Sequence, residues 1–115
     1  MYQHSYAEVL EDDQQKARRI EAQALDQVVA LLRQADTLPP PSIVGVRALH
    51  LTRELWVAFM TELASSENAL PERLRANLIS IGIWILKEAE AIRLGRSTNY
   101  AGIADICAIV RDGLL

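Results

Sequence analysis

Prolines, glycine and polar residues divide this chain into four segments, each with apolar side chains at helical spacing. The clearest division is Pro39-Pro40-Pro41, because successive prolines remove backbone donors and fix the backbone dihedral φ. A second division is Ser65–Asn68, which Pro71 follows, and a third begins at Gly95. No segment shows sustained strand-like alternation. The sequence therefore predicts a single domain with an all-α fold, a small bundle of about four helices.

The first predicted helix runs from about Asp13 to Ala35, where apolar residues recur at intervals of three, four and seven. Glu11, Asp12 and Asp13 suit the positive N-terminal end of a helix dipole, so we expect the helix to start there. The residues before them form a separate apolar patch, made of Tyr2, Tyr6, Val9 and Leu10.

The second predicted helix runs from Ile43 to Ala64, with Ser42 as its N-cap.

A fourth, short helix is predicted near the end of the chain, after a polar loop at 96–99, and Gly113 is expected to end it. Its apolar positions are Ile103, Ile106, Cys107, Val110 and Leu114.

The third predicted helix runs from Pro71 to about Leu94, with Gly95 as its C-terminal stop. Residues 78–86 are apolar almost all round, so we expect this helix to be the central element of the bundle, although a buried strand is the rival interpretation. Gly82 costs about 1 kcal/mol relative to Ala inside a helix. We therefore expect Trp56 or a neighbouring helix to pack closely over Gly82.

The chain lacks the residue clusters that enzymes and metal sites need. His4 and His50 have no Cys or acid at ligand spacing, and zinc requires about four converging ligands. Glycine-rich phosphate loops, dinucleotide fingerprints and nucleophile elbows are absent from the sequence. The single cysteine, Cys107, is expected to be a small buried apolar residue. We therefore predict a protein that is not an enzyme and has no catalytic residues, no cofactor and no metal.

The charge and hydropathy of the chain argue against nucleic acid and membrane as its partners. The chain has 12 basic and 15 acidic residues and a net charge of −3, whereas a protein that holds nucleic acid by charge is usually basic. The most apolar stretch, Ala76–Leu86, is much shorter than the roughly 20 residues of a membrane-spanning helix. The N-terminus lacks the features of a signal peptide. We expect a cytoplasmic protein that neither binds nucleic acid directly nor inserts into a membrane.

The predicted helix with Trp56 leads into a polar turn at 65–71, then into a long ordered motif at 74–84, and the chain closes on Gly113-Leu114. In this order the segments match the patterns S-x-E-N-x-L-P, L-R-x-x-L-I-S-I-G-x-W and a terminal G-L. Nearly the whole chain thereby resembles the FlaF family of alphaproteobacterial flagellar biosynthesis regulators, which shares this pattern. Relatives often have Asn-Arg where this chain has Cys107-Ala108.

The resemblance implies a non-enzymatic regulator of flagellin synthesis and export. FlaF proteins act alongside FlbT, which regulates translation of the flagellin messenger, and are thought to bind flagellin as secretion chaperones. A flagellin terminal region offers amphipathic helices, and an apolar groove can bury one. Two alternatives stay open: an adaptor that works through FlbT or the messenger without touching flagellin, and an enzyme. The candidate flagellin contacts are apolar and aromatic side chains: Tyr2, Tyr6, Leu49, Trp56 and Trp84.

Overall fold

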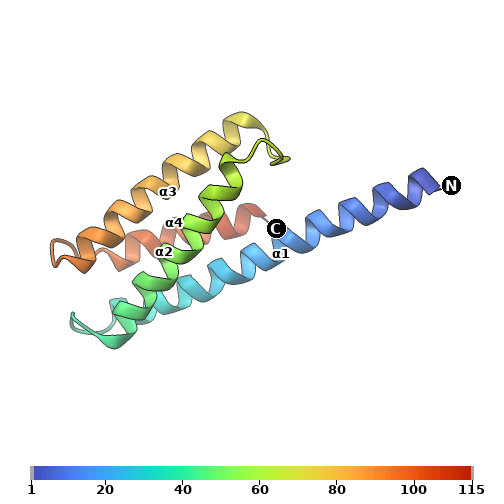
Figure 1. Cartoon of the computed structure of the whole chain (residues 1–115). Helices are drawn as coiled ribbons and strands as arrows, with labels where there is room; N and C mark the ends of the chain where they lie inside the picture. Colours follow the sequence, from blue (N-terminus) through green and yellow to red (C-terminus); the bar gives the residue numbers. More distant parts are fainter. Residues whose placement is uncertain (1, 115) are drawn as a thin grey trace.

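The computed structural model describes residues 2–114, without the side chains of residues 2–7 and 10. Over this range the chain folds into four helices and no strand, which confirms the all-α prediction. The helices run alternately in opposite directions and are joined by short loops (Figure 1). They are α1 (Tyr2–Asp36), α2 (Ile43–Ala64), α3 (Glu72–Arg93) and α4 (Tyr100–Leu114).

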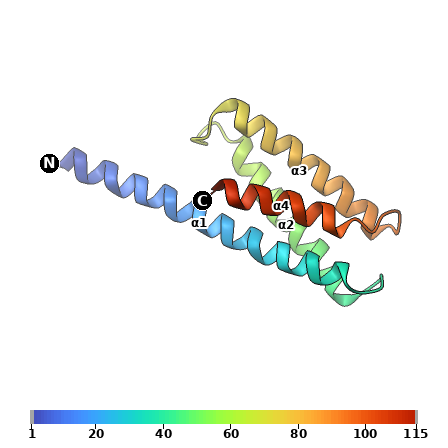
Figure 2. The ribbon, with the colours of Figure 1, turned by 180° about the vertical axis from the view of Figure 1, so that it is seen from behind.

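The four helices form a ring in which each packs against its two neighbours. α1 packs against α2 and α4, and α3 packs extensively against α2 but only weakly against α4. α2 lies in front in Figure 1 and α4 lies in front in Figure 2, so these two helices cover opposite faces of the α1–α3 pair. In the described part of the chain, the backbones of the diagonal pairs do not meet.

The core lies between all four helices, so the prediction that α3 is the central element is wrong. The buried residues of α3 lie on one face, whereas Ile83 and Trp84 are 44% and 41% exposed. The isoleucine-rich segment carries more apolar side chains than one helix face can bury, and the surplus reaches the surface. The largest fully buried side chains come from every helix: Leu25, Leu32, Thr52, Trp56, Leu63, Ile85, Ile103 and Cys107.

The first helix begins at Tyr2, so the predictions of a start near Asp13 and of a separate patch before it are wrong. No proline or glycine interrupts the chain before Asp36, and the helix simply continues through the acidic residues. Every described side chain before Glu21 is exposed. This half of α1 projects beyond the bundle, and it gives the molecule its 60 Å long axis (Figures 1 and 2).

Most other helix ends follow the predicted signals. The Ser42 hydroxyl accepts a hydrogen bond from the Gly45 backbone N–H at 2.9 Å, which confirms the N-cap of α2. α3 starts immediately after Pro71, and Gly95 just past its end has a φ of +75°, which glycine adopts without strain. Gly113 does not end α4, because the helix continues to Leu114, whose side chain packs against the core.

Candidate protein-binding surface

Trp56 is a core residue. Its side chain is 0% exposed, and its indole Nε1 donates a hydrogen bond to the Cys107 sulfur at 3.4 Å. The ring also meets Phe59 edge to face, with 5.4 Å between the ring centroids. A buried indole N–H needs an acceptor, and the buried thiol provides one. This position contradicts the prediction that Trp56 contacts a partner, and it confirms that Cys107 is buried.

Gly82 marks a close approach of α2 and α3. A Cβ atom at Gly82 would lie 2.5 Å from the Met60 sulfur and 3.1 Å from Cε3 of Trp56. The prediction that Trp56 or a neighbouring helix packs over this glycine is therefore confirmed. The tight contact fixes α3 against α2 along one flank, and it leaves the other flank of α3 facing α4.

The α3–α4 contact is the weakly closed side of the ring. Ile81 and Trp84 on α3 face Ile106 on α4 across a hollow of about 380 Å³. Ile109 follows Ile106 by three residues, so it lies on the same side of α4, and it is 67% exposed. We call these four apolar residues the seam strip: Ile81, Trp84, Ile106 and Ile109.

The ion pairs of α4 with other helices lead to α1 in the described part of the chain. Asp105 pairs with Arg33 of α1 at 3.0 Å, and Arg111 pairs with Asp26 of α1 at 2.9 Å. Among the described residues, no ion pair joins α4 to α3. α4 is therefore held to α1 by both charge and packing, and the seam with α3 is left to a few apolar contacts.

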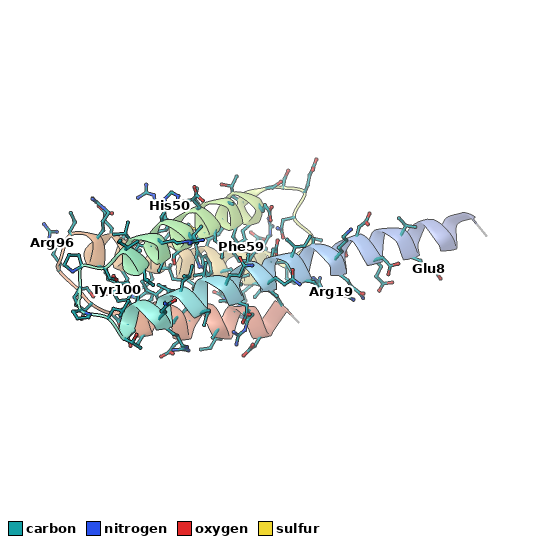
Figure 3. The ribbon with its side chains drawn as sticks, turned by 90° about the horizontal axis from the view of Figure 1, so that it is seen from below. Glu8, Arg19, His50, Phe59, Arg96 and Tyr100 are labelled. Carbon is teal, nitrogen blue, oxygen red and sulfur yellow. The ribbon has the colours of Figure 1, made fainter. Side chains whose placement is uncertain are left out.

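A second hollow, of about 720 Å³, lies between the start of α2 and the end of α3. Leu49 and Leu86 line it, as do the charged residues Arg53, Glu90 and Arg93. The Arg93 guanidinium donates two hydrogen bonds to Glu90, at 2.5 and 2.8 Å. These bonds hold the pKa of the Glu90 carboxyl below its usual value. Tyr100 lies at this end of the molecule (Figure 3).

The structure separates the predicted contact residues. Leu49 and Trp84 line two different hollows, on opposite flanks of α3. The side chains of Tyr2 and Tyr6 lie outside the described residues, although their backbone belongs to the projecting half of α1.

In the part of the chain that the structure describes, no three Cys, His, Asp or Glu side chains gather where they could hold a metal ion. No helix in this part is long and apolar enough to span a bilayer.

Comparison with known protein families shows to which family the chain belongs. The model of the flagellar protein FlaF matches residues 2–114, which includes all four helices. The chain belongs to the FlaF family. FlaF membership makes it a flagellar protein and confirms the resemblance carried by the turn and motif at 65–84. No curated protein and no solved structure gives a significant match.

Sequence reasoning missed three of the four seam residues of this FlaF-family chain. The spacing places Ile106 on the core stripe of the last helix, and Ile81 belongs to the central apolar segment. Cys107 and Val110 belong to the buried stripe of α4, whereas Ile109 lies outside this stripe and is exposed to solvent. A large apolar residue on the polar side of a short helix is the signal that would have indicated this surface.

Proposed function

We propose that this FlaF-family protein binds flagellin before export, as a secretion chaperone that also links flagellin supply to its translation. One amphipathic helix of the flagellin terminal region lies along the α3–α4 seam and buries the seam strip. The single observation that carries this proposal is the half-exposed apolar strip on the weakly closed side of the bundle. An unpartnered strip of this kind is typical of helix-in-groove recognition.

The chemistry of the seam favours an apolar helix face as its ligand. The lining side chains are apolar apart from Asn99 and Asp105, and Asp105 is already paired with Arg33. The Asn99 side chain covers Gly102 and accepts a hydrogen bond from its backbone N–H at 3.0 Å, so this polar group is already partnered at the start of α4. Recognition therefore depends on shape and apolar burial, with Asn99 as the polar group at the edge.

The exposed area of the strip supports reversible binding. Complete burial of one large apolar side chain contributes about 1.5–3 kcal/mol, and the strip residues are already partly buried. Association itself costs roughly 4–15 kcal/mol in lost freedom. A chaperone must release its client to the export machinery, and a strip with this small exposed area is suited to reversible binding.

Trp84→Ala tests the proposal, with Ile83→Ala as a matched control. Both residues lie on α3 and are exposed to similar extents, but only Trp84 lines the seam. Binding of each variant to full-length flagellin, and to flagellin lacking either terminal region, is measured by titration calorimetry. We expect Trp84→Ala to weaken binding about tenfold or more, as a central tryptophan contact does. Ile83→Ala should bind like the parent chain.

Two outcomes would decide against this function. If the parent chain binds no flagellin segment, the chaperone proposal fails. If it binds FlbT instead, and Trp84→Ala weakens that complex, the seam serves the adaptor that works through FlbT on the flagellin messenger. Circular dichroism of both variants shows whether a loss of binding reflects the seam or a loss of helical structure.

A further inference from the structure

The projecting half of α1 carries apolar and charged side chains on a face that no other helix of the bundle covers. Figure 3 shows Glu8 and Arg19 on a stretch of helix with no other helix beside it. Val9 and Ile20 on this stretch are 56% and 57% exposed. A helix of about this length is marginal on its own in water, because most helical stability comes from packing. Such a helix is stabilised when a second helix covers it.

The spacing of this face is that of a coiled-coil seam. Val9, Asp13, Lys16 and Ile20 follow one another at intervals of four, three and four, which is the spacing of heptad core positions. The next positions in the same series are Gln23 and Gln27, and both are exposed although they lie beside the bundle. The face therefore points away from the core, and a second helix can run along it without meeting α2 or α4.

The charges on this face select the direction of a second helix. The segment 8–13 contains four acidic residues and no base, and the segment 16–19 contains three bases and no acid. When two copies pair in opposite directions about an axis between Gln14 and Gln15, Asp13 of each faces Lys16 of the other. Val9 of each then faces Ile20 of the other. Parallel pairing would instead place Asp13 against Asp13 and Lys16 against Lys16, which is unfavourable.

We propose that two copies of this chain pair through their projecting α1 helices, in antiparallel orientation, with two Asp13–Lys16 contacts about the two-fold axis. The same surface patch is used by both copies, as a closed symmetric dimer requires. The two bundles then lie at opposite ends of the paired helices. This interface is separate from the α3–α4 seam, so it does not depend on the function proposed above.

The experiment uses charge exchange on the full chain. Sedimentation equilibrium, without flagellin, gives the dimer dissociation constant of the parent chain and of Asp13→Lys and Lys16→Asp. Both single variants should weaken the homodimer about tenfold or more, because each turns two attractive contacts into two repulsive ones. The double variant Asp13→Lys/Lys16→Asp should restore it. An equal mixture of the two single variants should form a heterodimer, since all of its contacts are complementary.

Asp13 and Lys16 are both exposed in the free chain, so neither substitution removes a core contact. A parent chain that stays monomeric at hundreds of micromolar overturns the proposal. So does a dimer that the single variants leave unchanged. If the parent is monomeric but Asp13→Lys weakens its binding to flagellin, the projecting helix serves a different partner and self-pairing is excluded.

Discussion

Glu21 and Glu62 bring two carboxyl groups together where α1 leaves the bundle. Burial, the hydrogen bond with Glu62 and the negative charge of Glu62 together raise the pKa of Glu21 to about 7, although the nearby positive charge of Arg18 opposes them. The usual value is 4.5. In the folded protein Glu21 therefore keeps its proton until the pH approaches neutrality, whereas in the unfolded chain it loses the proton near pH 4.5.

This difference makes the folded state bind a proton more tightly than the unfolded state. The contribution to stability is complete below pH 4.5 and is lost as the pH rises to about 7. The full pKa difference would correspond to about 3 kcal/mol of unfolding free energy. Glu21 is still partly exposed to water, which screens the interaction, so we expect a loss of about 1 kcal/mol between pH 5 and pH 8.

Glu21→Gln removes the titrating group and keeps a side chain that can donate to Glu62. Urea unfolding at pH 5, 6, 7 and 8 measures the free energy of unfolding of both proteins. The variant should match the parent at pH 5 and exceed it by about 1 kcal/mol at pH 8. Glu67→Gln, an equal charge change at an exposed loop residue, should show no such divergence. A difference between Glu21→Gln and the parent that stays constant across this range would refute the reasoning.

Two further predictions concern the core. Gly82→Leu should lower the free energy of unfolding by about 1–3 kcal/mol in urea titrations, because the added side chain meets Met60 and Trp56, and unchanged stability would contradict the close α2–α3 contact. Burial raises the pKa of the Cys107 thiol to about 11, so a thiol reagent at pH 8 should label it only when the chain unfolds. Rapid labelling of the folded protein would show that the Trp56–Cys107 contact opens.

Helix boundaries were predictable wherever a residue type enforces them. Ser42, Pro71 and Gly95 act through local hydrogen bonding or backbone dihedrals, and α2 and α3 begin and end within a residue or two of the predicted positions. The start of α1 was not predictable in this way, because acidic residues are compatible with a helix interior as well as with its first turn. Without a proline or glycine before it, the helix extends to Tyr2.

The assignment of apolar side chains to core or surface depends on which helix faces them. Trp56 and Trp84 both occur at helical spacing among apolar residues, yet one is buried and the other is 41% exposed. Trp56 points to the α2–α3 crossing, where Gly82 leaves room for it, and Trp84 points to the seam that α4 does not close. Spacing within one helix carries no information on how tightly its neighbours approach.

The two proposed interfaces lie on different parts of the molecule, and this separation can be tested. The seam lies between α3 and α4, whereas the face proposed for dimerisation lies on the outer side of α1. Flagellin bound at the seam therefore leaves the α1 face free for a second copy of the chain. If both proposals hold, light scattering of the mixture should show two FlaF-family chains with two flagellins. Asp13→Lys should give a complex of one with one at unchanged flagellin affinity, and Trp84→Ala should remain dimeric. A flagellin that splits the parent dimer into one-to-one complexes would show instead that client and second copy compete for the same helix.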